Sequence, residues 1–213
     1  MNYLAHMVVG HWAGLDEFGI LGNFIGDAVK GRNVEASWGE KVSHGIRIHR
    51  SIDDVSDRHA ASCEARRVLR SGCGKWSGVV WDVLADHVLA SEFDALAHGC
   101  GLLDSFAKRH EVLLGHKRDA MPDRSRRFFD AMVSHGWLQG YREPSTVEAV
   151  LVAMSRRRPT SGPVIRGWDA FLREEVLLRE LGRDLIHHME MWVKEANLVS
   201  LPHMHLTLSL IHI

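Results

Sequence analysis

The apolar residues of the chain recur mostly at steps of three and four, and alternating runs rich in β-branched residues are scarce. This pattern predicts an all-α protein. The expected helices span residues 15–30, 41–69, 76–97, 103–114, 144–157 and 164–196. One more helix is expected between 114 and 144: it follows a turn at 121–124 and ends near residue 137. A break is expected near residues 57–59, and Gly182 is a weak point in the last helix.

Segment 76–97 is apolar around most of its surface, which places it at the centre of the expected core. No linker and no internal repeat divide the chain, so residues 1–200 are interpreted as a single helical domain. The tail at 201–213 is apolar without a helical stripe. It is interpreted either as a docked extension or as a foreign C-terminal sequence, and no function is assigned to it.

The composition narrows the functional classes. A chain of 213 residues with 26 Lys and Arg against 27 Asp and Glu has a formal net charge of -1, which disfavours a bulk binder of nucleic acid. Its three cysteines contain no C-x-x-C pair, so neither a disulfide framework nor a thiolate zinc site is indicated and a cytoplasmic location fits best. No segment approaches the roughly 20 apolar residues of a membrane span. The 15 histidines are the unusual feature.

The strongest local pattern lies at residues 45–57. His49, Asp53 and Asp57 are spaced four apart and share one helix face, beside an apolar stripe that includes Ile48 and Ile52. Imidazole and carboxylate groups at the edge of a buried face are costly to desolvate unless a cation or a hydrogen-bond network satisfies them. Taken alone, such a pair is more often a hydrogen bond on a helix surface, and Asp57 equally suits a helix cap.

Two other helices repeat this arrangement. Asn23 and Asp27 are four apart on the preceding helix, where Gly22 and Gly26 would let a neighbouring helix approach closely. Asp86 and His87 lie inside the apolar run of the third helix. Oxygen and imidazole donors without thiolate favour Mn²⁺ or a similar divalent cation such as Mg²⁺. A bound cation of this kind suits hydrolysis of a phosphoester.

Two arginine groups stand apart from these helices. Arg124, Arg126 and Arg127 form one, and residues 156–158 form the other. They are interpreted either as solvated faces near helix ends or as a dock for an acidic partner or a phosphate. Nearby, Trp137, Tyr141 and Arg142 have the spacing to wall a pocket or to pack in the core.

Six ordered blocks of the sequence resemble the acyl carrier protein phosphodiesterase family. The blocks are Met1 to His6, Gly22-Asn23 with Asp27, Gly45 to Asp57, Asp82 to Leu89, Trp137 to Arg142, and Ser155 to Arg157 with Pro159. The resemblance implies an all-helical enzyme, distantly similar to the HD-type metal-dependent phosphohydrolases. Such an enzyme uses Mn²⁺ to cleave 4′-phosphopantetheine from a serine of holo-acyl carrier protein, and it leaves the apo-carrier protein.

The resemblance also implies residue roles. The expected catalytic set is Asp27, His49, Asp53, Asp86 and His87, and the expected metal-binding set is Asp27, His49, Asp53 and Asp86 with His6 and Asn23 in or near it. Substrate binding is expected from Arg50, Tyr141, Arg142, Arg124, Arg126 and Arg127. Because carrier proteins of this kind are acidic, the arginines at 124–127 and 156–158 are expected on the rim of the metal pocket.

Two alternatives stay open at this point. The same metal site would serve an HD-like phosphohydrolase that acts on a nucleotide or another small phosphoester. A helical module without catalysis would instead bind an acidic carrier protein through its arginines. The sequence makes no prediction of the oligomeric state.

Overall fold

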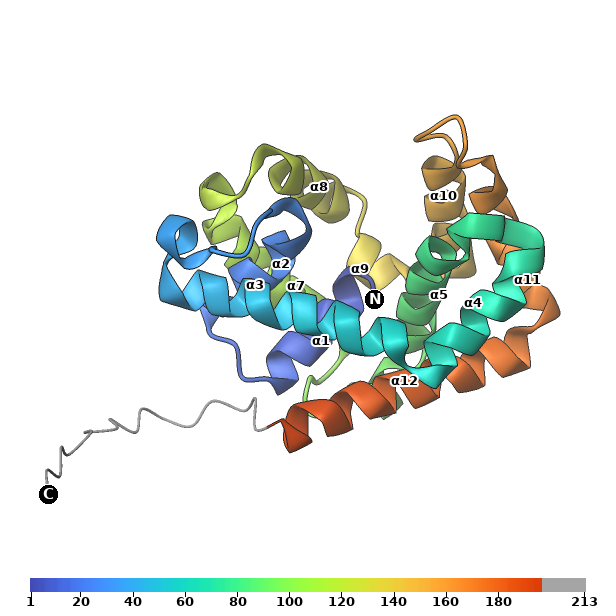
Figure 1. The fold of residues 1–213 in the computed structure, drawn as a ribbon, viewed down its shortest axis with the longest axis horizontal. Coiled ribbons are helices and arrows are strands. Elements are labelled where there is room, and N and C mark those ends of the chain that lie inside the picture. Colours follow the sequence, from blue (N-terminus) through green and yellow to red (C-terminus); the bar gives the residue numbers. More distant parts are fainter. Residues whose placement is uncertain (197–213) are drawn as a thin grey trace, which may run out of the picture.

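The computed structural model describes residues 1–196, and helices without any strand account for the regular structure of this part of the chain. The α-helices are α1 (Tyr3–Trp12), α2 (Glu17–Ile25), α3 (Glu35–Arg58), α4 (Ala60–Cys73), α5 (Ser77–Ser91), α6 (Phe93–Leu96), α7 (Leu103–His116), α8 (Asp123–Ser134), α9 (Trp137–Gly140), α10 (Pro144–Ser155), α11 (Gly167–Arg173) and α12 (Glu175–Glu195). The all-α prediction is confirmed (Figure 1). Within residues 1–196, no helix combines the length and apolar character needed to cross a bilayer. The tail at 201–213 and the last residues of the predicted domain lie outside the described residues.

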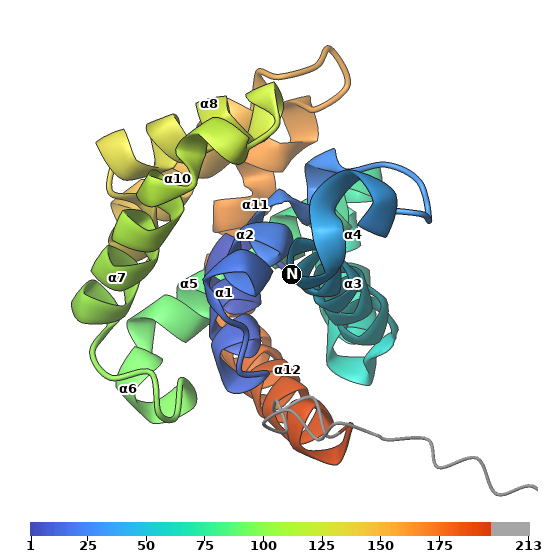
Figure 2. The ribbon, with the colours of Figure 1, turned by 90° about the vertical axis from the view of Figure 1, so that its left-hand side faces the viewer.

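Helix α5 is the centre of the core, as its apolar circumference predicts. Val80, Trp81, Leu84 and Val88 are all buried, and the helix packs against α1, α4, α10 and α12. In Figure 2, α7, α8 and α10 lie along one side of the molecule and α3 and α4 along the other, with α1 and α2 between them. Helix α12 runs along the base of the fold (Figure 1).

The helix that the periodicity does not predict is α1. Its residues from Leu4 to Gly10 are all buried, including His6. Because α2, α3, α5 and α12 enclose this part of the helix, it has no solvent-facing side and no exposed polar stripe interrupts its apolar run. The missing stripe explains why α1 escapes a search for amphipathic spacing, although it carries a residue of the site.

The predicted break near residues 57–59 is confirmed at His59. Its extended backbone separates α3 from α4, and its Nδ1 accepts a hydrogen bond of 3.3 Å from the backbone N–H of Ala61. Near its other end, α3 is kinked at Gly39, which has φ +69°. The regular part of α3 therefore begins close to the predicted start at residue 41.

Several predicted helices are divided at positions that local backbone geometry determines. The helix predicted at 76–97 ends at Ser91 and resumes as α6, and the one predicted to reach 137 ends at Ser134 before Gly136 adopts φ +58°. The segment 164–196 breaks at Glu174 rather than at Gly182. Gly182 instead stays inside α12, because its missing side chain makes room for Val88 of α5.

Helices α2 and α3 cross with their backbones in contact. A Cβ atom on Gly22 would overlap the backbone carbonyl of Val42, and one on Gly45 would overlap the backbone carbonyl of Gly19. The close approach expected at Gly22 is therefore present. Because neither helix can yield here without moving its backbone, the crossing sets the relative position of α2 and α3.

Candidate functional site

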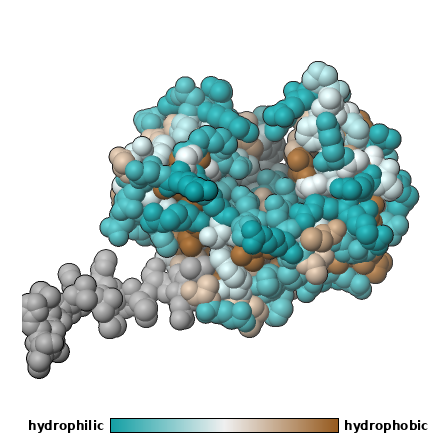
Figure 3. Space-filling model, in the orientation of Figure 1, coloured by the Kyte–Doolittle hydropathy of each residue, from teal (hydrophilic) through white to brown (hydrophobic). Residues whose placement is uncertain are grey.

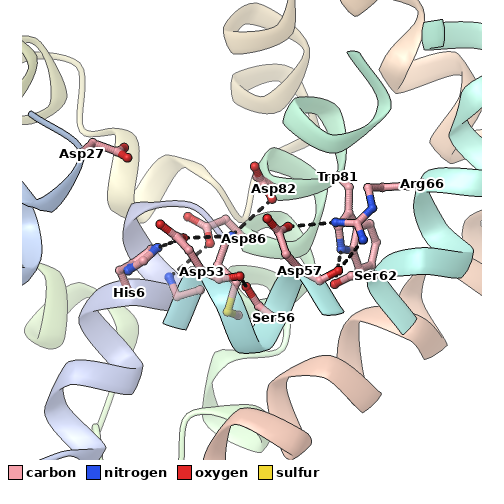
Figure 4. Close-up of polar contacts among 12 residues, drawn as sticks. His6, Asp27, Asp53, Ser56, Asp57, Ser62, Arg66, Trp81, Asp82 and Asp86 are labelled. Carbon is pink, nitrogen blue, oxygen red and sulfur yellow. Dashed lines mark hydrogen bonds and ion pairs between the residues drawn. The ribbon is translucent and has the colours of Figure 1, made fainter. Parts of the chain in front are cut away.

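Two helices, α1 and α3, bring His6, His49 and Asp53 into one cluster. His6 lies on α1, and His49 and Asp53 are one turn apart on α3. One ligand atom from each lies within 4.8 Å of the others. The two imidazole rings stack at a centroid distance of 4.2 Å, and His6 Nε2 is 3.0 Å from Asp53 Oδ1, as Figure 4 shows for that pair. The sequence predicts that separate helices bring imidazole and carboxylate groups together, and the structure places these three residues close enough to share one ion.

Asp27 approaches this cluster from the short 3-10 turn that follows α2 (Gly26–Ala28). His49 Nε2 lies 3.5 Å from Asp27 Oδ1 and 3.3 Å from Asp53 Oδ2, yet neither contact has the direction of a hydrogen bond. A buried ring nitrogen that faces two carboxylates without such a bond is suited to share a cation with them.

The packing of the cluster depends on small neighbours. A Cβ atom on Gly26 would overlap the ring of His49, so the glycine lets the imidazole lie against the backbone. Asn23 Nδ2 donates a 2.7 Å hydrogen bond to the carbonyl of His6, while its Oδ1 is buried without a partner. Asn23 thus ties α2 to α1 beside the cluster and leaves one oxygen available there.

The electrostatics of the cluster separate its two histidines. Burial lowers the pKa of His6 to about 4, against the opposing effect of its hydrogen bond to Asp53. For His49, burial is outweighed by Asp27 and Asp53, which raise its pKa to about 9. Burial also opposes ionisation of Asp53, but His49 and His6 hold the pKa of this carboxyl well below its usual range. Both carboxylates are therefore charged near neutral pH, since His49 lowers the pKa of Asp27 as well.

Asp86 is fully buried beneath the N-terminus of α1. Its two carboxylate oxygens accept hydrogen bonds of 2.9 and 3.1 Å from the backbone N–H groups of Leu4 and Ala5. Burial raises the pKa of Asp86 to about 7, although those two donors act in the opposite direction. Figure 4 shows Asp86 near Asp53 and Asp82, and the amino group of Met1 lies 3.3 Å from Asp82. Asp86 anchors the helix that carries His6.

His87, the next residue, faces another part of the fold. Its Nδ1 donates a 2.8 Å hydrogen bond to the backbone carbonyl of Tyr141, and its ring meets Trp168 and Phe171 edge-on. Arg179 lies on its other nitrogen at 3.4 Å. The structure therefore does not bring His87 to the cluster but uses it to hold the chain at Tyr141.

A cavity of about 570 Å³ adjoins the cluster at Asp27. It is lined by Tyr3, by Phe128 and Trp137 on the side of α8 and α9, and by Val150 and Met154 on α10. Tyr3 and Phe128 stack at 4.0 Å. In the space-filling view the surface is hollowed between the α8 side and the α10 side (Figure 3).

The predicted substrate-binding residues divide between this cavity and other places. Arg124, Arg127 and the buried Tyr141 line it, together with Arg157 from the second arginine group. Arg126 instead pairs with Asp123, and Arg142 pairs with Asp104 at 2.9 Å on another face.

Arg50 and Asp57 lie outside this cavity. Arg50 donates a 3.0 Å hydrogen bond to the carbonyl of Val29 and lines a second, more open depression on the other side of Asp27. Asp57, the last member of the predicted face on α3, pairs with Arg66 at 2.8 Å. The carboxylates along α3 therefore have different partners: Asp53 belongs to the cluster, and Asp57 pairs with Arg66 of α4.

Tyr3 is the functional candidate that sequence reasoning did not single out. Burial raises the pKa of its hydroxyl to about 12, with a further contribution from Asp27 and opposing effects of Arg124 and Arg157. The hydroxyl is thus a neutral donor at the end of the cavity that meets the cluster. Its place between Asn2 and His6 is no signal by itself, because α1 shows no polar face.

Comparison with known proteins identifies the family of this chain. A family model described as acyl carrier protein phosphodiesterase matches residues 1–187. The acyl carrier protein phosphodiesterase of Yersinia pestis is 33% identical over 159 residues, which cover 75% of this chain and 80% of the relative. The chain belongs to the acyl carrier protein phosphodiesterase family.

Other relatives in the acyl carrier protein phosphodiesterase family show similar coverage. One from Escherichia coli O6:H1 is 31% identical over 171 residues, or 79% of this chain and 84% of the relative. One from the K12 strain DH10B is 32% identical over the same length. No solved structure matches the chain, so the likeness to HD-type phosphohydrolases stays a prediction.

Proposed function

We propose that this protein hydrolyses holo-acyl carrier protein to apo-acyl carrier protein and 4′-phosphopantetheine. Membership of the family supports the reaction. The structural observation that carries the proposal is the meeting of His6, His49, Asp53 and Asp27 beside a cavity with arginines on its lining. This combination offers donors for a cation and positive charge for a phosphate within one site.

The residues suited to hold a divalent cation are His6, His49 and Asp53, with Asp27 beside them. Mn²⁺ is the proposed ion and Mg²⁺ the alternative, because two imidazoles in a donor set shift the preference from magnesium toward manganese. A cation bound here supplies Lewis-acid polarisation of the phosphoryl group and lowers the pKa of water. Asn23 Oδ1 and His49 Nε2 are buried atoms without a hydrogen-bond partner, and both suit coordination of such an ion.

The protein groups have distinct roles in the proposed reaction. Asp27 is charged and its side chain is 62% exposed, so it can accept the proton of the attacking water. Tyr3, which keeps its proton, donates toward a phosphate oxygen, and Arg124 and Arg157 attract the phosphate to the same end of the cavity. As the water oxygen bonds to phosphorus, the bond between phosphorus and the serine oxygen breaks, and the serine of the carrier protein leaves with the proton that Asp27 accepted.

Asp86 and His87 act as positioning residues in this proposal. Asp86 holds the first turn of α1 at the two residues before His6, and His87 holds the carbonyl of Tyr141 at the cavity wall. Neither residue is among those that line the cavity. The proposed location is the cytoplasm, in keeping with three cysteines that are free.

The deciding experiment is mass spectrometry of holo-acyl carrier protein incubated with the purified protein, with Mn²⁺ or with a chelator. Loss of the phosphopantetheine mass only in the presence of metal is expected. His49→Ala and Asp53→Asn are expected to lower the rate by about a thousandfold or more, since each removes a donor. The matched control is His44→Ala on the same helix, because His44 is exposed.

Two results would contradict the proposal. A stable complex with the carrier protein and no cleavage would indicate a binding module. Cleavage of nucleotides or other small phosphoesters, with holo-carrier protein left intact, would indicate a different phosphohydrolase.

A further inference from the structure

Two depressions of different character meet at Asp27. The cavity of about 570 Å³ extends from Asp27 and Tyr3 between α8 and α10. The second depression, of about 390 Å³, lies beside the loop after α2 and is lined by Lys30, Arg32 and Arg50 as well as by Asp27, His49 and Asp53. The candidate metal cluster thus lies between two spaces that a substrate could occupy together.

The linings of the two spaces differ in chemistry. The cavity is walled by aromatic and aliphatic side chains, including Phe128, Trp137 and Met154. No Phe, Tyr or Trp lines the second depression, and its acidic residues are Asp27 and Asp53 of the cluster itself. Lys30 and Arg32 are exposed, while Arg50 is held by the carbonyl of Val29. Positive charge here is therefore available to a partner on the surface.

We infer that the substrate lies across Asp27, with its pantetheine arm in the aromatic cavity and its acidic carrier protein over Lys30, Arg32 and Arg50. The inference rests on the proposed function and adds the direction in which the substrate binds. It also assigns carrier docking to a surface different from the arginines at 124–127.

The sizes and charges of the two spaces support this direction. A volume of about 570 Å³ is within the range of small-molecule pockets, about 300–1,000 Å³, and is far too small for a folded protein. The pantetheine arm beyond its phosphate is uncharged, which suits apolar and aromatic walls. An acidic protein surface is recognised by exposed cations, whose main effects are on encounter and orientation. The basic depression is open to such a surface.

The arginines of the cavity have a separate task in this arrangement. Besides burial, which has the largest effect, the negative charge of Asp27 raises the pKa of the Tyr3 hydroxyl, and the positive charges of Arg124 and Arg157 lower it. Both arginines line the same cavity as Tyr3 and Asp27, and Asp27 borders the cluster where the phosphate would be. The positive charge of the cavity is matched to the phosphate, and that of the depression is matched to the carrier protein.

The test separates the two halves of the product by calorimetry on the Mn²⁺-loaded protein. The probes are free 4′-phosphopantetheine and apo-acyl carrier protein. Ala153→Trp and Ala131→Trp narrow the cavity from its α10 and α8 sides. Each is expected to weaken 4′-phosphopantetheine binding at least tenfold and to leave apo-carrier binding within about twofold. The two tryptophans lie on different helices. If one of them points away from the cavity, the other variant still tests the inference.

The double variant Lys30→Glu with Arg32→Glu is expected to do the reverse. Apo-carrier binding falls at least tenfold at low salt, and 4′-phosphopantetheine binding stays within about twofold. The control is Arg67→Glu with Arg70→Glu, an equal double charge reversal at exposed positions on α4. The inference is overturned if the cavity variants weaken apo-carrier binding, or if the charge reversals weaken the free arm instead.

Arm release by the unmodified protein is measured alongside. Without release from holo-carrier protein, the proposed function fails whatever the binding pattern is. With release but without the opposite binding effects, the inference alone fails.

Discussion

The α2–α3 crossing and the α8–α10 side of the cavity place their side chains by different means. At the crossing, backbone touches backbone through Gly22 and Gly45, and the next glycine along, Gly26, receives the ring of His49. Across the cavity, side chains of separate helices face each other over open space. A metal site needs donor atoms held within a few tenths of an ångström, whereas a flexible arm needs only a wall of suitable volume and polarity. The comparison teaches that tolerance to substitution should differ sharply between the two regions.

The largest expected effect is at the crossing itself. Gly22→Ala places a methyl group on the backbone of Val42, which cannot move aside, and is expected to cost about 3 kcal/mol or more of unfolding free energy. Chemical denaturation measures it. Gly115→Ala is the matched control: a Cβ there meets Phe129 at an ordinary 3.9 Å, and alanine favours the helix by about 1 kcal/mol. Equal stability of both variants would refute backbone contact at the crossing.

The second effect concerns the ring that Gly26 accommodates. Gly26→Ala is expected to displace His49 and to lower Mn²⁺ affinity by about 10- to 100-fold, with the helical signal retained. Titration of Mn²⁺ against a chelating indicator measures the change. Unaltered affinity would show that His49 does not bind the ion from its present position.

The third effect distinguishes an anchor from a metal ligand. Asp86→Asn keeps the shape of the side chain but replaces one acceptor of the Leu4 and Ala5 N–H groups by a donor, at an expected cost of about 2 kcal/mol in stability. Mn²⁺ affinity is expected to fall far less than in His49→Ala. Loss of Mn²⁺ binding as complete as in His49→Ala, with stability unchanged, would instead make Asp86 a ligand.

The fourth effect is a pH dependence of metal binding. Asp27 and Asp53 outweigh burial and raise the pKa of His49 to about 9, so below that pH the metal-free ring is protonated and a cation must displace the proton. Mn²⁺ affinity is therefore expected to rise by up to tenfold per pH unit between pH 6.5 and 8.5 and to level off near pH 9. A flat profile in chelator competition would contradict a protonated His49.

The smallest effect is expected at the far wall of the cavity. Met154→Leu conserves volume and apolar character, so stability should change by less than about 1 kcal/mol and the KM for holo-carrier protein by less than about threefold. Steady-state kinetics and thermal unfolding test both values. A tenfold loss of catalytic efficiency here would mean that the cavity wall is as exacting as the metal side, and the comparison would not hold.

Much of this architecture is readable from the chain. The step of His49 and Asp53 by four residues puts both on one face of α3, and the glycines at 22 and 26 indicate a close neighbour on α2. The family blocks lead to the same helices. Within the predicted arginine groups, however, spacing does not separate Arg124, which faces the cavity, from Arg126, which pairs with Asp123.

By itself, the sequence determined the helical class, the shared face on α3 and the close approach at Gly22, because these follow from the period of a helix and the size of a side chain. Only the tertiary structure decided that α1 delivers His6 and that Asp86 and His87, though adjacent, serve an anchor and a cavity wall. The reason is that helical spacing fixes which residues point the same way, while the neighbour they meet depends on how distant helices pack.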